Sequence, residues 1–148
     1  MRGGAQLFAL PLAPWERGAL EAALKKTGLP CDDVLAPALL FWRFEQADVP
    51  AGFGGLEICG EDALLRSLVT LPPLRRRGVG SAIVGILETE ALARQMRALY
   101  LLTTDCASFF ARLGYAPCRR EDVPAAVQAS AQFAGSCPAN AVVMMKPL

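Results

Sequence analysis

The residues best suited to chemistry lie in one basic, glycine-containing turn at 75–80, RRRGVG. An apolar run at 64–69 precedes this turn, and after it apolar residues recur at three- and four-residue steps, which is typical of a helix. The first N–H groups of a helix lack partners within the helix, and its dipole adds partial positive charge there. Glycines let a ligand approach the backbone, and arginines supply fixed charge. The turn therefore predicts an anion site, most simply for a phosphate or pyrophosphate.

The spacing in this turn excludes two common phosphate motifs. No Gly-Lys-Ser/Thr follows the glycines, so the turn is not a Walker loop, and the three glycines of a dinucleotide fingerprint are missing. Three cations at a helix start would oppose the helix dipole if no anion were bound. We therefore expect a different phosphate-containing ligand.

Composition and charge indicate one packed domain over residues 1–148. Hydrophobic residues make up 53% of the chain and the formal net charge is +1, which argues against a nucleic-acid-binding protein. The start of the chain lacks the apolar segment of a signal peptide, and the uncharged stretch 123–145 is interrupted by prolines and amides. We expect a cytoplasmic protein with no membrane partner.

The cysteines and the absence of histidine favour neither a metal site nor a disulfide framework. The chain has five cysteines, no Cys-x-x-Cys pair and no histidine. We expect no metal, and buried thiols in a reducing compartment. The cysteines are Cys31, Cys59, Cys106, Cys118 and Cys137.

Periodicity and turn residues predict an α/β order of elements. A break in the apolar run at Arg66 and Ser67 suggests a bulge or a site in a central strand. Asp105 is a candidate helix cap. The expected elements are a strand at 6–10, a helix at 14–27, a loop or short helix at 29–37, strands at 39–45, 52–59 and 63–69, a helix at 78–94, a strand at 98–102, a helix at 106–113, a strand from 115, a helix at 125–133 and a strand at 141–145.

Two motifs in this order resemble those of the GNAT N-acetyltransferase family. Arg75-x-x-Gly78-x-Gly80 is similar to the family's coenzyme A motif, Arg/Gln-x-x-Gly-x-Gly/Ala, and FFARLGY at 109–115 is similar to its Phe-Tyr-x-x-x-Gly-Phe signature. The resemblance is close over 39–115 and looser at the ends. It implies a single α/β (α+β) domain with a mixed, mostly antiparallel sheet flanked by helices, splayed central strands and acetyl-CoA in the central cleft. It also suggests a homodimer.

A narrower resemblance concerns the substrate. Three pairs of segments resemble small acetyltransferases from bacterial arsenic-resistance clusters, which in turn resemble phosphinothricin acetyltransferases. The pairs are ALLRSLV and LRRRGVG, LYLLTT and FFARLGY, and VPAA and AQFAGSCP. This implies transfer of an acetyl group to a primary amine of a small molecule, such as a phosphinothricin- or arsinothricin-like amino acid. The amine would attack directly in a ternary complex.

The family resemblance also assigns cofactor-binding residues. The pantetheine arm would lie along the strand that precedes the turn, and the backbone N–H of Val69 would polarise the thioester carbonyl. Two positions depart from the family: Phe110 stands where a tyrosine acid is usual, and Thr103 where an asparagine is common. The leaving thiolate then has no acid, or is protonated by water or another group. The expected cofactor residues are Leu68, Val69, Thr70, Arg75, Arg76, Arg77, Gly78, Val79, Gly80, Ser81, Thr103 and Phe110.

The acceptor side is less defined, and each candidate has a structural alternative. Glu57 could be the general base or a solvated glutamate, and Arg66 could bind a substrate carboxylate or arsonate, or form an ion pair with Glu57 or Asp62. Cys106, near a helix start, could have an acidified thiol. Three further residues could line the acceptor site or serve in packing and capping: Thr104, Gln128 and Gln132.

Three other functions remain open at this stage. Phe110 at the acid position is compatible with a catalytically silent acyl-CoA sensor. Acetylation of protein N-termini or lysines would require an open, acidic acceptor groove. An arsenic- or metal-binding protein would require at least three cysteines to converge.

Overall fold

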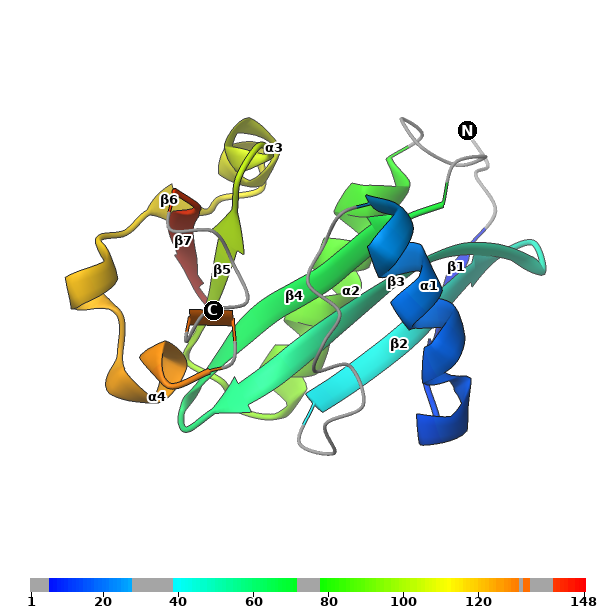
Figure 1. Cartoon of the computed structure of the whole chain (residues 1–148), viewed down its shortest axis with the longest axis horizontal. Helices are drawn as coiled ribbons and strands as arrows, with labels where there is room; N and C mark the ends of the chain where they lie inside the picture. Colours follow the sequence, from blue (N-terminus) through cyan, green and yellow to red (C-terminus); the bar gives the residue numbers. More distant parts are fainter. Residues whose placement is uncertain (1–5, 28–38, 72–77, 131, 134–139) are drawn as a thin grey trace. The chain divides into compact units, whose positions relative to one another are not determined.

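The computed structural model describes residues 6–27, 39–71, 78–130, 132–133 and 140–148. Its strands, α-helices and 3-10 helices (η) are, in chain order, β1 (Leu7–Pro11), η1 (Pro14–Glu16), α1 (Arg17–Thr27), β2 (Leu39–Gln46), β3 (Val49–Cys59), β4 (Asp62–Thr70), α2 (Val79–Ala93), β5 (Ala98–Thr103), α3 (Ala107–Arg112), β6 (Ala116–Pro117), η3 (Arg120–Asp122), α4 (Ala125–Gln128) and β7 (Val142–Pro147) (Figure 1). The expected loop or helix at 29–37 lies outside the described residues.

The strands form one mixed sheet in the order β1-β2-β3-β4-β5-β7-β6. β1 pairs antiparallel with β2, and β7 pairs antiparallel with both β5 and β6. β4 and β5 are parallel, and their register comprises Ala63↔Leu99 and Leu64↔Tyr100. The mixed, mostly antiparallel sheet flanked by helices confirms the expected fold class.

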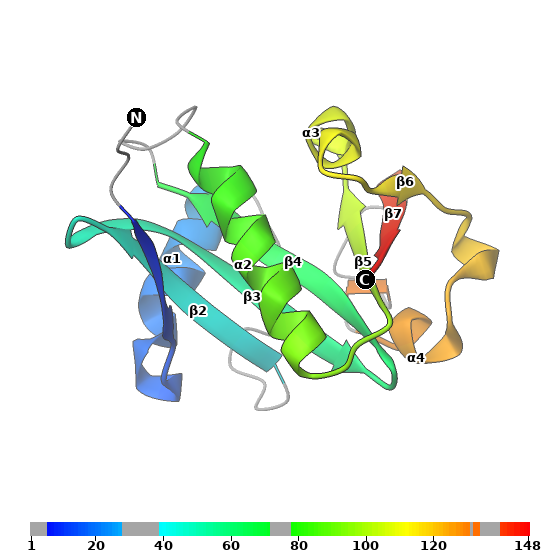
Figure 2. The ribbon, with the colours of Figure 1, turned by 180° about the vertical axis from the view of Figure 1, so that it is seen from behind.

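Two compact units make up this fold, one of residues 1–55 and 67–87 and the other of residues 56–66 and 88–148. In the first unit, α1 and α2 cover opposite faces of the strands: α1 is in front in Figure 1, and α2 is in front in the reverse view of Figure 2. The core on the α1 side joins Leu20 and Leu24 of the helix to strand residues. The strand and loop members of this core are Leu12, Leu39, Phe41, Phe53 and Val69.

Three glycines in β3 allow the first unit to pack closely. A Cβ at Gly52 would lie 2.1 Å from the carbonyl oxygen of Val69, and one at Gly54 would lie 2.8 Å from Leu87 Cδ1. A Cβ at Gly55, whose neighbours are in β2, would lie 2.5 Å from a Phe41 ring carbon. Side chains alternate between the faces of a strand, so Gly52 and Gly54 make room for β4 and α2, and Gly55 makes room for the aromatic ring.

The second unit has its own core between α4 and the neighbouring strands. Val123 and Val127 pack with Tyr100 and Val143. α4 is shorter than the helix expected at 125–133, because it ends at Gln128 with Ala129 as its C-cap. Buried Ser130 follows, and its hydroxyl accepts a hydrogen bond from the N–H of Phe133.

β4 departs from regular strand geometry where the sequence suggested it would. Ser67 has a φ of 58°, in the left-handed region that residues with a side chain rarely adopt, and it is buried. A residue of this conformation within a strand is typical of a bulge. Among the described residues, no helix is long and apolar enough to cross a membrane.

We expect Gly52→Ala to destabilise the protein by about 2 kcal/mol, because the new methyl group meets a backbone carbonyl that cannot rotate away. Gly85→Ala is the matched control, since a Cβ at this exposed position in α2 meets no atom within 4 Å. That change should stabilise the helix by about 0.5–1 kcal/mol. Urea unfolding of both variants measures the difference, and equal stabilities would contradict the proposed close approach.

Candidate functional site

The start of α2 offers exposed backbone that could bind an anion. Gly78 has a φ of 76°, and its carbonyl accepts the first helical hydrogen bond, from the N–H of Ala82 at 3.1 Å. Among the described residues, no atom lies within 4 Å of the position that a Cβ at Gly78 would take. Val79 is buried and anchors the turn, whereas Ser81 is exposed. The N–H groups of a first helical turn, such as that of Gly80, have no partner within the helix and could bind an anion such as a pyrophosphate.

The basic part of the motif, Arg75, Arg76 and Arg77, lies outside the described residues. Its contribution to anion binding stays a prediction. The last residues of β4 are in the same compact unit as the start of α2. Val69 is buried, Leu68 and Thr70 are half-buried, and the N–H of Leu71 donates to Ala51 of β3 at 2.8 Å. The strand expected to hold the pantetheine arm is thus fixed against β3 to its end.

Glu57 and Arg66 form an ion pair in the second unit. Arg66 Nη1 lies 3.5 Å from Glu57 Oε1, and the side chain of Arg66 is fully buried while that of Glu57 is 16% exposed. This confirms the structural alternative for Arg66. A buried pair of this kind holds the carboxylate in place, and the remaining exposure of Glu57 leaves it accessible to water. Their roles as base and substrate anchor stay predictions.

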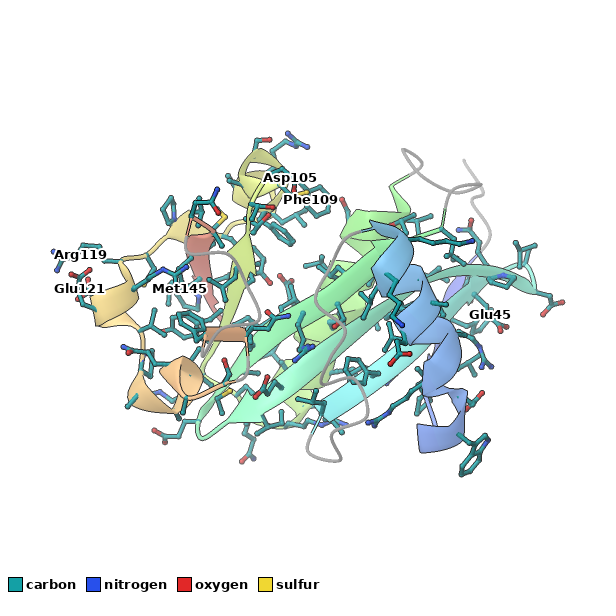
Figure 3. All side chains as sticks on the ribbon, viewed as in Figure 1. Glu45, Asp105, Phe109, Arg119, Glu121 and Met145 are labelled. Atoms are coloured by element: carbon teal, nitrogen blue, oxygen red, sulfur yellow. The ribbon has the colours of Figure 1, made fainter. Side chains whose placement is uncertain are left out.

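The hydroxyl of Thr103 supports the start of α3. Its Oγ1 accepts a hydrogen bond from the N–H of Cys106 at 3.0 Å, and the residue is buried. The expected cap at Asp105 is wrong: Cys106 is the N-cap residue, and its own side chain makes no capping hydrogen bond to the helix. The carboxylate of Asp105 instead accepts a hydrogen bond from the thiol of Cys106 at 3.4 Å. Figure 3 shows Asp105 and Phe109 near α3. Thr104, next to this turn, is exposed.

Phe110 is buried among aromatic rings. Its ring packs edge-on against Phe109 at 5.0 Å and against Tyr115 at 5.7 Å between centroids. The hydroxyl of Tyr115 donates to Glu88 Oε2 at 2.9 Å. Burial, and then the nearby Glu88 carboxylate, raise the pKa of Tyr115 far above its usual value. Tyr115 therefore keeps its proton and donates it in the hydrogen bond to Glu88.

Sequence reasoning missed Glu88 and Lys146. Lys146 Nζ lies 3.0 Å from the same Glu88 oxygen. The local sequence around Lys146 does not predict this contact, because Glu88 is 58 residues away in the chain. Only the paired strands and the helix bring them together.

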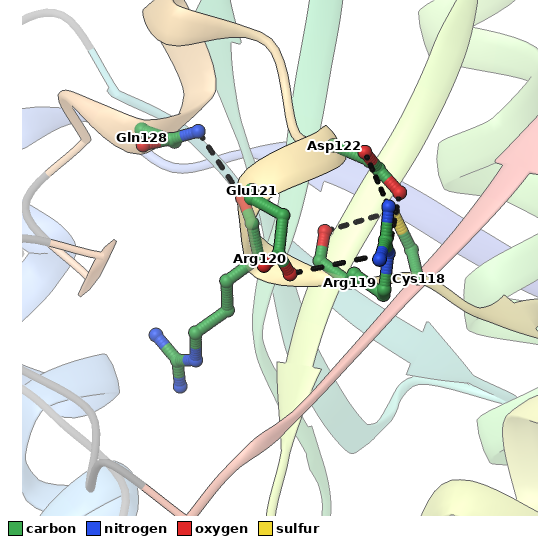
Figure 4. Close-up of polar contacts among 6 residues, drawn as sticks. All are labelled: Cys118, Arg119, Arg120, Glu121, Asp122 and Gln128. Atoms are coloured by element: carbon green, nitrogen blue, oxygen red, sulfur yellow. Dashed lines mark hydrogen bonds and ion pairs between the residues drawn. The ribbon is translucent and has the colours of Figure 1, made fainter.

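Gln128 serves a structural role in the described segment. Its amide donates to the carbonyl of Arg120 at 3.1 Å (Figure 4). It also donates to the carbonyl of Val123 at 2.7 Å, and the two bonds close the turn between η3 and α4. The neighbouring Arg119 pairs with Asp122 at 3.0 Å in the same view. Arg119 and Glu121 are also labelled in Figure 3. Gln128 thus confirms the capping alternative, while Gln132 is buried.

The cysteine thiols are not activated in the described residues. Burial raises the pKa of Cys106, and the Asp105 carboxylate raises it further, so the idea of an acidified thiol is wrong. Burial and nearby carboxylates raise the pKa of Cys59 to about 11. Among the described residues, no cluster of histidine, cysteine or carboxylate side chains could hold a metal. Cys31 and Cys137 lie outside the described residues.

Solved structures of other proteins share this fold. N-acetylglutamate synthase from Neisseria gonorrhoeae, complexed with coenzyme A and N-acetyl-glutamate, has a TM-score of 0.79 and 14% identity over 99% of this chain and 36% of that chain. Rv2747 from Mycobacterium tuberculosis, in complex with CoA, has a TM-score of 0.75 and 19% identity over 95% of this chain and 99% of that chain. The ribosomal-protein-S18-alanine N-acetyltransferase from Escherichia coli has a TM-score of 0.68 and 19% identity over 96% of this chain and 94% of that chain.

The chain thus spans about a third of the length of the synthase and nearly all of the other two. No protein of curated function matches the sequence significantly. Residues 5–115, three quarters of the chain, match the Acetyltransferase (GNAT) family. Together with the mixed sheet, this match shows that the chain belongs to the Acetyltransferase (GNAT) family and is an acyltransferase that uses acetyl-coenzyme A.

Proposed function

We propose that this protein transfers the acetyl group of acetyl-CoA to a primary amine of a small molecule, by direct attack in a ternary complex. The observation that carries the proposal is the turn at Gly78, an exposed residue whose positive φ directly precedes the first residue of α2. The bound cofactor would supply an acyl group already activated as a thioester. The chain itself has to bind this cofactor, position the amine and accept its proton.

The binding residues that we propose lie in the first compact unit. Backbone N–H groups from Arg76 to Ser81 would hold the pyrophosphate, with Arg75 as an added cation. Leu68, Val69 and Thr70 would hold the pantetheine arm, and the N–H of Val69 would donate to the thioester carbonyl oxygen. Thr103 and Phe110 of the second unit complete the proposed set. The hydroxyl of Thr103 already accepts one bond, so it would act on the cofactor as a donor.

On the acceptor side we propose Glu57 as the proton acceptor, directly or through water. Its ion pair with Arg66 fixes the carboxylate, and its partial exposure supports access by water. Arg66 is buried, so a role in binding a substrate carboxylate requires that the substrate share it with Glu57. Thr104 and Gln132 are further proposed acceptor-side residues. The amide nitrogen of Gln128 already donates to two backbone carbonyls, so Gln128 would accept a hydrogen bond from the substrate through its amide oxygen.

We propose an amino acid of the phosphinothricin or arsinothricin type as the acceptor. The three segments that resemble arsenic-cluster acetyltransferases support this choice. The synthase of similar fold was solved with N-acetyl-glutamate, and the S18 enzyme is named for a protein alanine, so a protein acceptor is the alternative to test. We also propose that residues 1–148 act as one cytoplasmic catalytic domain and that it forms a homodimer.

Turnover should be measured first as thiol release from acetyl-CoA across a panel of amines. We expect release with a phosphinothricin-like amino acid, and none with a basic peptide or a peptide with the S18 N-terminus. Release only with a peptide would overturn the small-molecule assignment. Acetyl-CoA binding without release for any amine would favour an acyl-CoA sensor.

Gly80→Asp should weaken CoA binding by about 10- to 100-fold, because it places a carboxylate among the N–H groups proposed for the pyrophosphate. An acidic residue in the first turn suits the helix dipole, so the fold should persist. Gly85→Asp is the matched control: it adds the same side chain to the same helix at an exposed position. Calorimetric titration with CoA measures both, and equal affinities would mean that the start of α2 does not bind the pyrophosphate.

Phe110→Tyr should raise kcat by about tenfold if the leaving thiolate lacks a protein acid, since it restores a hydroxyl at that position. The gain should decline at high pH as the new phenol ionises. Phe109→Tyr, on the adjacent, half-buried ring, is the control and should leave kcat unchanged. A folded Phe110→Tyr variant with no gain would show that protonation of the thiolate does not limit turnover.

A further inference from the structure

One carboxylate oxygen in the second unit joins a helix, a strand and the loop residue Tyr115. Glu88 Oε2, on α2, accepts a hydrogen bond from the Tyr115 hydroxyl at 2.9 Å and lies 3.0 Å from Lys146 Nζ on β7. The side chains of Glu88 and Lys146 are only 19% and 29% exposed. A charge-assisted contact at this depth is less screened by solvent than a surface pair.

Lys146 also holds the end of α3. Its Nζ donates to the carbonyl of Leu113, the C-cap residue of α3, at 2.9 Å. The next residue, Gly114, has a φ of 98°, and a Cβ there would lie 3.3 Å from Lys146 Cε. The same ammonium lies 5.6 Å from the centroid of the Tyr115 ring. Lys146 therefore fixes both the turn after α3 and the ring that follows this turn.

The contacts of Tyr115 extend the arrangement to Phe110. The two rings meet edge to face at 5.7 Å and 74°, and the N–H of Tyr115 donates to the carbonyl of Phe110 at 3.1 Å. Edge-to-face rings constrain each other's orientation. Because Tyr115 stays protonated, its hydroxyl remains a donor to Glu88 across the pH range in which an enzyme works. The chain of contacts thus runs from Glu88 through Tyr115 to Phe110.

We infer that Glu88 is a positioning residue for the acyl transfer: through Tyr115 and Lys146 it sets the orientation of the Phe110 ring. The inference rests on the proposed function, in which Phe110 lies beside the acyl thioester. Glu88 itself neither binds substrate nor moves a proton. A misplaced Phe110 would reduce the chemical step more than the binding of acetyl-CoA, since the proposed pyrophosphate site is on other residues.

The test compares Glu88→Gln with Glu90→Gln. Both changes remove one charge from α2 and keep the side-chain shape, but Glu90 pairs with Arg94 at the surface. We expect Glu88→Gln to lower kcat by about fivefold with KM for acetyl-CoA within about twofold, and Glu90→Gln to leave both unchanged. The aromatic NMR signals of Phe110 in 13C-phenylalanine-labelled protein, assigned with Phe110→Leu, should shift in Glu88→Gln alone.

A second variant keeps the inference testable if Glu88→Gln does not fold. Tyr115→Phe retains the ring and removes only the hydroxyl, and it should shift the same Phe110 signals and lower kcat similarly. The two effects should not add in the double variant, because both break one contact. Unchanged Phe110 signals in a folded variant would overturn the inference. The NMR test needs no turnover, so an inactive wild-type protein would count against the proposed function and not against this arrangement.

Discussion

The close approach of β3 to the end of β4 and to α2 is the constraint on which the proposed site depends. No side chain fits at Gly52, because its Cβ would lie 2.1 Å from the carbonyl oxygen of Val69. Gly54 likewise admits the side chains of α2. The residues proposed to hold the pantetheine arm, Leu68 to Thr70, thereby lie beside a strand that carries no side chain at positions 52 and 54. A cofactor-binding strand held by backbone contacts is rigid, which is what positioning of a thioester requires.

Two kinds of departure from regular backbone geometry frame this strand. Ser67 has a positive φ within β4, and Gly78 has one just before α2. A positive φ costs free energy for a residue with a side chain, so the surrounding structure must hold Ser67 in this conformation. Gly78 adopts its conformation without that cost. Both residues lie in the first unit, next to residues proposed to bind the cofactor through backbone N–H groups.

In the second unit, the residues proposed for function would act through their side chains and not through backbone groups. Glu57 is partly exposed and pairs with buried Arg66, and Glu88 accepts a hydrogen bond from Tyr115, which follows α3. Its described thiols, those of Cys59, Cys106 and Cys118, have raised pKa values, which agrees with a reaction that needs no protein nucleophile. Several candidate residues also stabilise the fold: the amide of Gln128 donates a hydrogen bond to the Val123 carbonyl, and the hydroxyl of Thr103 accepts one from the Cys106 N–H. In this unit binding and folding therefore depend on the same groups.

Local pattern by itself determined the order of elements, the start of α2 and the motif that led to the family, because periodicity, glycines and prolines act over a few residues. It also located the irregularity at Ser67. Local pattern did not yield the N-cap of α3, which is Cys106 and not Asp105, or the length of α4. Nor did it reveal the contact of Glu88 with Tyr115 and Lys146. Those contacts join residues distant in sequence, and only tertiary packing decides which polar side chains meet once the apolar ones are buried.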